Sequence, residues 1–142
     1  MCQVIYFSRG GNTKKLADAI AAELNVDAIE VNRASLKSKT GKLFLGSGCY
    51  GGEPGRDMLT FLNNNEFDGI RVALFGTSGG GAGRELASMS KILEEKGAII
   101  LGRFACKGKT FMIINRRHPD DNDLAEARRF AQEKTERPNS HQ

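Results

Sequence analysis

Hydrophobic runs and amphipathic segments alternate along this chain. The hydrophobic runs predict strands at residues 3–7, 27–31, 42–46, 70–76 and 98–104. Helical periodicity and helix-end residues predict helices at residues 13–24, 55–64, 83–96 and 120–134. Strands that alternate with helices of this length form βαβ units, so the pattern predicts an α/β protein built on a parallel sheet.

Two of the hydrophobic runs are continuous rather than alternating. Residues 72–75 read Val-Ala-Leu-Phe, and residues 98–101 read Ala-Ile-Ile-Leu. Continuous runs are typical of strands that helices cover on both faces. Residues 32–41 are polar and few, so we do not expect a full helix there, and residues 109–114 extend the last strand or form a short one.

The last two predicted helices carry clear positional signals. In the helix at 83–96, Leu86, Met89 and Leu93 share one face, and Gly97 ends the helix. In the helix at 120–134, Pro119 is expected at the first helical position. Acidic residues follow this proline and favour the positive end of the helix dipole.

Length and composition are typical of one soluble domain. The chain has 142 residues, of which 39% are hydrophobic and 27% charged. We expect the domain to span residues 1–136 and residues 137–142 to form a frayed polar tail. No apolar run reaches membrane-spanning length, and no basic segment precedes the first apolar run, so a cytoplasmic location without membrane association is expected.

The charge and the cysteines narrow the function classes. The net charge is +4, but Lys and Arg are scattered and Trp is absent, which disfavours nucleic-acid binding. An anionic cofactor or an acidic redox partner explains the positive net charge equally well. Cys2, Cys49 and Cys106 form no C-x-x-C pair, so neither a metal site nor a dithiol motif is expected.

Glycine-rich loops follow three of the predicted strands. They lie at residues 8–13, 46–52 and 77–83, after the first, third and fourth strands. In an open parallel sheet, ligands bind outside the carboxyl ends of the strands. Three such loops at one edge indicate that the backbone approaches a flat ligand closely.

The first loop carries the strongest motif. It reads Ser8-Arg9-Gly10-Gly11-Asn12-Thr13. It resembles the phosphate loop of flavodoxins, Ser/Thr-x-Thr-Gly-x-Thr, and Ser8, Gly11 and Thr13 match that pattern. Gly10 stands where the family usually has a hydroxyl, and Arg9 could supply charge to the phosphate instead. The alternative is that Asn12 or Thr13 simply caps the helix.

The second loop resembles the loop after the third strand of flavodoxins. It contains Ser47, Gly48, Cys49, Tyr50, Gly51 and Gly52. On this resemblance Tyr50 would stack on the isoalloxazine ring and the loop backbone would meet its N5 edge; the alternative is a half-exposed loop aromatic. A dinucleotide fingerprint at Gly46-x-Gly48-x-x-Gly51 is disfavoured because Glu53-Pro54 delays the helix. A phosphatase-type cradle of Cys49 and Arg56 is disfavoured because its spacing is one residue too long.

The third loop resembles the loop that covers the other side and the pyrimidine edge of the flavin. It contains Thr77, Ser78, Gly79 and Gly80 and has no aromatic residue. The alternative is a flexible loop that only leads into the next helix. Residues 102–131 resemble a subgroup of short flavodoxins, in which Cys106 is expected to be structural and His118 to lie at the helix entry.

The resemblance implies a flavodoxin-like fold, with strand order 2-1-3-4-5 and helices on both faces. It implies non-covalent FMN, electron transfer between partner oxidoreductases with an acidic docking face, and no catalytic set in the protein itself. Two alternatives remain: a flavin-dependent quinone or NAD(P)H reductase on the same fold, and a non-redox module that binds a phosphate ligand.

Overall fold

The computed structural model describes residues 2–37, 40–78, 83–107 and 119–135. Its strands are β1 (Cys2–Phe7), β2 (Ala28–Glu30), β3 (Lys42–Gly48), β4 (Arg71–Ser78) and β5 (Ile99–Lys107). Its α-helices are α1 (Asn12–Leu24), α2 (Arg56–Asn64), α3 (Arg84–Glu95) and α4 (Asp121–Thr135). The strands form one parallel sheet in the order β2-β1-β3-β4-β5, which confirms the predicted fold class and order.

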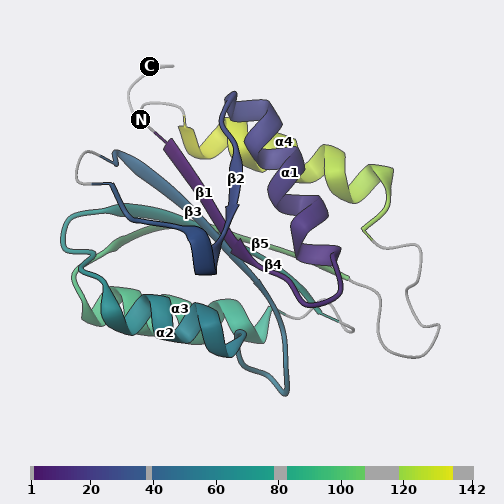
Figure 1. Ribbon diagram of the computed structural model, residues 1–142. Helices are drawn as coiled ribbons and strands as arrows, with labels where there is room; N and C mark the ends of the chain where they lie inside the picture. Colours follow the sequence, from purple (N-terminus) through teal and green to yellow (C-terminus); the bar gives the residue numbers. More distant parts are fainter. Residues whose placement is uncertain (1, 38–39, 79–82, 108–118, 136–142) are drawn as a thin grey trace.

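Helices cover both faces of the sheet. Helices α1 and α4 lie on one face, and α2 and α3 lie on the other (Figure 1). The strand order reverses between β1 and β3, because the chain moves outward to β2 and then returns to the opposite side of β1. That reversal is the position at which open α/β sheets bind ligands.

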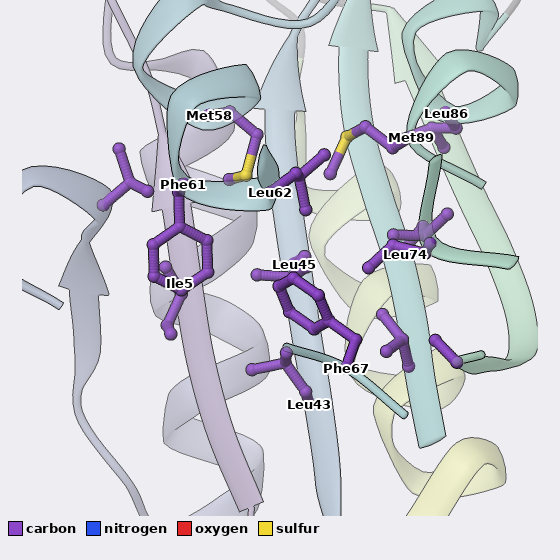
Figure 2. Close-up of a cluster of buried hydrophobic side chains, with 14 residues drawn as sticks. Ile5, Leu43, Leu45, Met58, Phe61, Leu62, Phe67, Leu74, Leu86 and Met89 are labelled. Atoms are coloured by element: carbon purple, nitrogen blue, oxygen red, sulfur yellow. The ribbon is translucent and has the colours of Figure 1, made fainter. Parts of the chain in front are cut away.

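The first core lies between the sheet and helices α2 and α3. Ile5, Leu43, Leu45 and Leu74 point from the strands toward Phe67 and the buried side chains of the two helices (Figure 2). The helical spacing predicted for α3 is confirmed, since Leu86, Met89, Ser90 and Leu93 are all buried. Burial of this kind contributes about 1.5–3 kcal/mol for each large apolar side chain.

The second core lies under α1 and α4. It contains Val4 and Tyr6 from β1, Phe44 from β3 and Phe75 from β4, packed against buried side chains of the two helices. The rings of Phe44 and Phe130 meet edge to face with centroids 6.2 Å apart. Residues 72–75 are thus buried on both faces, as their continuous hydrophobic run predicts.

The structure corrects three details of the predicted elements. Ile99 is 53% exposed, so residues 98–101 are not covered on both faces; β5 is an edge strand. The helix α4 begins at Asp121, two residues after Pro119, because Asp120 and Asp123 form a reciprocal capping box around its first turn. The expectation of no full helix at residues 32–41 is confirmed where they are described: the only helical turn there is a 3₁₀ turn, η1 (Val31–Arg33).

Residues 109–114 and the predicted tail at 137–142 lie outside the described part of the chain. Among the helices that the structure describes, none has the length and hydropathy that crossing a bilayer requires.

Gly46 provides a test of how closely the second core is packed. A Cβ atom at Gly46 would overlap the ring of Phe75, its cross-strand partner. We expect Gly46→Ala to lower the free energy of unfolding by about 1–3 kcal/mol, because Phe75 must leave its position in a filled core. Urea denaturation of the protein without ligand measures this.

Gly10→Ala is the matched control, since a Cβ there meets no atom within 4 Å. We expect it to change the free energy of unfolding by no more than about 0.5 kcal/mol. Equal effects of the two substitutions would contradict the packing described for Gly46.

Candidate functional site

Three loops meet at the carboxyl edge of the sheet. The loop after β1 leads into α1, the loop after β3 leads into α2, and the loop after β4 leads into α3. The register places Phe7 beside Ser47 and Gly48 beside Thr77, so the loops leave the sheet at nearly the same level. Of the predicted site residues, Gly79 and Gly80 lie outside the described residues.

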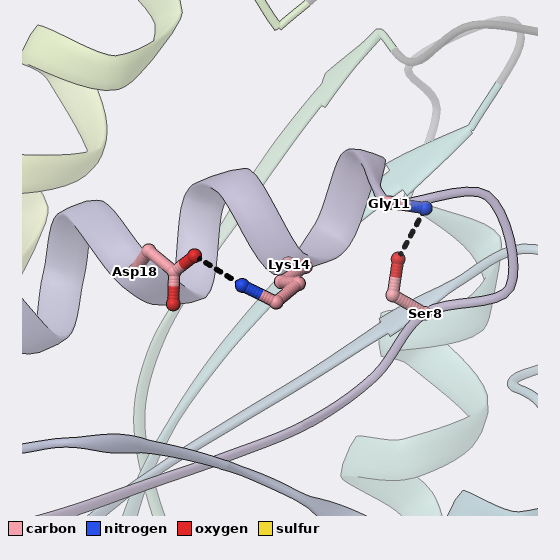
Figure 3. A network of polar contacts seen from close by, with 4 residues as sticks. All are labelled: Ser8, Gly11, Lys14 and Asp18. Atoms are coloured by element: carbon pink, nitrogen blue, oxygen red, sulfur yellow. Dashed lines mark hydrogen bonds and ion pairs between the residues drawn. The ribbon is translucent and has the colours of Figure 1, made fainter.

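The first loop forms a tight turn in front of α1. Ser8 Oγ accepts a hydrogen bond from the N–H of Gly11 at 3.0 Å (Figure 3). Gly11, rather than Asn12 or Thr13, occupies the N-cap position with φ 95°, a backbone conformation that favours glycine. The alternative that Asn12 or Thr13 caps α1 is therefore wrong.

The start of α1 is suited to an anion. The first turn of the helix has no acidic residue, so its backbone N–H groups and dipole are not neutralised by a nearby carboxylate. Lys14 pairs with Asp18 at 2.8 Å, one turn further along the helix (Figure 3). Beside the helix start, the space at Gly10 is open and admits either a ligand oxygen or a larger side chain.

Tyr50 of the second loop lies against the first loop. Its hydroxyl accepts a hydrogen bond from the N–H of Arg9 at 3.1 Å. The guanidinium carbon of Arg9 lies 4.5 Å from the centroid of the Tyr50 ring, and the Phe7 ring meets that ring edge to face at 5.9 Å. The predicted phosphate-binding arginine and the predicted flavin-stacking aromatic therefore lie in direct contact.

A glycine turn follows Tyr50. The backbones of Tyr50 and Glu53 exchange hydrogen bonds of 2.8 and 3.3 Å. Gly51 and Gly52, between them, have φ 65° and 86°. Two consecutive positive φ angles are typical of a type I′ turn, which explains the glycine pair.

Ser47 connects the end of β3 to the start of α2. Its Oγ donates to the carbonyl of Gly48 at 2.8 Å and accepts from the N–H of Gly55 at 3.0 Å. The side chain is fully buried, and its contribution to flavin binding stays a prediction. Residues 52–55 separate the glycine motif at residues 46–51 from the start of α2, whereas a dinucleotide fingerprint leads directly into a helix.

Thr77 joins all three loops. Its Oγ1 lies 2.9 Å from Thr13 Oγ1, at the start of α1, and both side chains are buried. Its carbonyl accepts a hydrogen bond from the N–H of Cys49 at 3.0 Å. These two contacts hold the first and second loops against the end of β4.

Glu85 is a site residue that the sequence reasoning missed. It lies in the first turn of α3, is fully buried, and neither carboxylate oxygen has a hydrogen-bond partner among the described residues. Burial raises its pKa, and its own backbone N–H and the thiol of Cys49 act in the opposite direction. One signal was available: Glu85 precedes Met89 by four residues and so lies on the apolar face of the helix.

The thiols of the site remain protonated. Burial and the nearby Glu85 raise the pKa of Cys49, which opposes its use as a phosphatase-type nucleophile. Burial raises the pKa of Cys106 to about 12, in agreement with a structural role. Within the described residues, no group of His, Cys, Asp and Glu could hold a metal ion.

Glu85 makes the stability of the protein depend on pH. Its folded-state pKa is raised, so between the unfolded pKa of about 4.3 and the folded value only the unfolded chain loses this proton. The contribution of Glu85 to the free energy of unfolding is therefore fully present at acidic pH and is lost as the pH rises through its folded-state pKa. We expect Glu85→Gln to be more stable than the natural protein above that window and to show the smallest difference below it. Urea denaturation across pH measures this, with the exposed Glu95→Gln on the same helix as a control.

Comparison with known proteins agrees with this geometry. Residues 3–116 match the sequence profile of a flavodoxin domain family. The chain is 30% identical over 131 residues to an uncharacterized protein of Methanocaldococcus jannaschii, an alignment that covers 84% of this chain and 87% of that protein.

Solved structures show the same fold. A flavodoxin from the domain Archaea has a TM-score of 0.76 and 22% identity, with 93% of this chain and 94% of that chain covered. Oxidised flavodoxin 1 from Bacillus cereus has a TM-score of 0.73 and 21% identity, with 94% and 95% covered. Since the family profile spans most of the chain and the sheet order is that of these structures, this protein belongs to the flavodoxin domain family.

Proposed function

We propose that this protein binds FMN without a covalent bond and carries electrons between partner oxidoreductases. One observation carries the proposal: an anion-binding helix start, an aromatic side chain and two further strand ends meet at the topological switch point, held together by Thr13 and Thr77. FMN supplies the redox chemistry when bound, and the protein binds and orients it.

The residues present fit this cofactor. The terminal phosphate is proposed to lie at the start of α1, where Gly10 leaves open space and Arg9 adds positive charge. The ring is proposed to lie along the second loop and the end of β4, beside Tyr50 and Thr77. Arg9 and Tyr50 contact each other, so phosphate and ring binding are expected to be coupled through this pair.

The direct test is a titration of the purified apoprotein with FMN, followed by its visible spectrum. We expect saturable binding. Arg9→Ala should weaken it by about 10- to 100-fold, because a charge-assisted hydrogen bond to phosphate is lost. Gly10→Thr should strengthen it by about 2- to 10-fold, because the open position gains a hydroxyl donor.

Lys15→Ala removes an exposed cation from α1 and is the matched control. It should leave the affinity for FMN nearly unchanged. A protein that stays colourless with added FMN would favour a non-redox phosphate-binding module. Rapid NAD(P)H oxidation by the purified protein alone would favour a reductase.

The positive net charge of the chain leads to a second prediction, which concerns the reduction potential. A net charge of +4 stabilises negative charge that electrons bring to the site, and salt screens this effect. We expect a second reduction potential that is less negative than that of an acidic flavodoxin and that becomes more negative as salt is added. We also expect docking to an acidic face of the redox partner. Potentiometry at low and high salt measures this, and a very low, salt-insensitive potential would contradict it.

A further inference from the structure

The buried Glu85 and the half-buried Cys49 interact beside the loops of the proposed flavin site. We propose that Glu85 is a proton-binding group of this site: in the pH range where its carboxyl group ionises, it takes up a proton from solvent when an electron enters the flavin site. The inference rests on the proposed function. It assigns to this chain a residue that couples electron transfer to proton uptake.

Position is the first argument. Helix α3 places Glu85 against Gly76, the residue before Thr77 in β4, and any side chain at position 76 would overlap Glu85 Oε2. The same position faces the carbonyl of Ser47, at the end of β3. The carboxyl group therefore lies under the strand ends from which the second and third loops emerge.

The described residues around Glu85 offer no cation to a negative charge on its carboxyl group. Within the described residues no Lys or Arg forms an ion pair with it, and neither carboxylate oxygen has a hydrogen bond of good geometry. The described titratable residues on the adjoining segments are Cys49 and Glu53 in the second loop, Arg56 and Asp57 at the start of α2, Arg84 on α3, and Cys106 and Lys107 at the end of β5. Burial raises the pKa of Glu85 and outweighs the opposing effects of its own backbone N–H and of the Cys49 thiol. A buried acid without a cation favours its neutral form.

Cys49 gives the proton a route. Its thiol is half-buried and interacts with Glu85, whereas Glu85 itself is closed to solvent. Cys49 lies in the second loop, and its N–H donates a hydrogen bond to the carbonyl of Thr77 at the end of β4. The pair thus lies between the solvent-facing loop and the interior of the sheet edge.

Charge coupling follows from this placement. Where Glu85 is ionised before reduction, one electron arrives from a reduced partner protein and one proton arrives from solvent; the proton ends on a carboxylate oxygen of Glu85, and no bond within the chain breaks. The electron's negative charge in a weakly screened interior makes the proton bind more tightly. By reciprocity, a protonated Glu85 makes the electron bind more tightly than an ionised one does.

The first measurement needs no flavin. Infrared spectra of the apoprotein at about pH 6, where exposed carboxyl groups are ionised, should show the carbonyl band of a protonated carboxylic acid. The band should vanish in Glu85→Gln and persist in the control Glu95→Gln. Absence of the band in the natural protein overturns the proposal.

The second measurement uses the FMN-loaded protein. We expect its reduction potential to fall as pH rises through the titration of Glu85, and we expect this part of the pH dependence to be lost in Glu85→Gln and kept in Glu95→Gln. Cys49→Ser retains a polar hydrogen at the same place and should keep this part of the pH dependence. An identical pH dependence in Glu85→Gln and the natural protein overturns the coupling.

The two measurements separate the possible failures. A protein that binds no FMN overturns the proposed function and the coupling that rests on it. The infrared band then still decides whether Glu85 is the protonated acid. A protein that binds FMN but lacks the band overturns only the assignment of Glu85.

Discussion

The register of the three central strands is the constraint on which the rest of the site depends. Because β1, β3 and β4 are parallel and paired from Phe7 beside Ser47 to Gly48 beside Thr77, their loops emerge together. The buried Thr13–Thr77 hydrogen bond then joins the start of α1 to the end of β4. A shift of register by one residue would turn Thr77 to the opposite face and break this contact.

The two faces of the sheet contribute differently to the site. The α1 and α4 face supplies the helix start that is suited to phosphate, and its core positions that helix through buried side chains such as Leu16 and Ile20. The α2 and α3 face supplies Glu85, at the top of a predominantly apolar core. The site therefore joins a positively polarised helix terminus to a buried acid that no cation among the described residues accompanies.

Glycines serve different physical needs within the same loops. Gly51 and Gly52 allow a turn with two positive φ angles. Gly76 instead makes room for a carboxyl group. Gly10 meets neither need, because its backbone is not in the left-handed region and its surroundings are open. A substitution there is expected to change the ligand contacts more than the stability of the fold.

The sequence by itself determined the order of the elements, the parallel sheet and the three glycine loops at one edge. These follow from local signals: continuous apolar runs, helical periodicity and loop composition. The strand order was implied by the resemblance of the loop motifs to flavodoxins. Only the tertiary structure decided that Tyr50 lies against Arg9, that Ile99 is exposed on an edge strand and that Glu85 is buried with no cation beside it among the described residues. Each of these depends on which segments meet in space, and an acidic residue in the first turn of a helix has the same local pattern whether it faces water or the core.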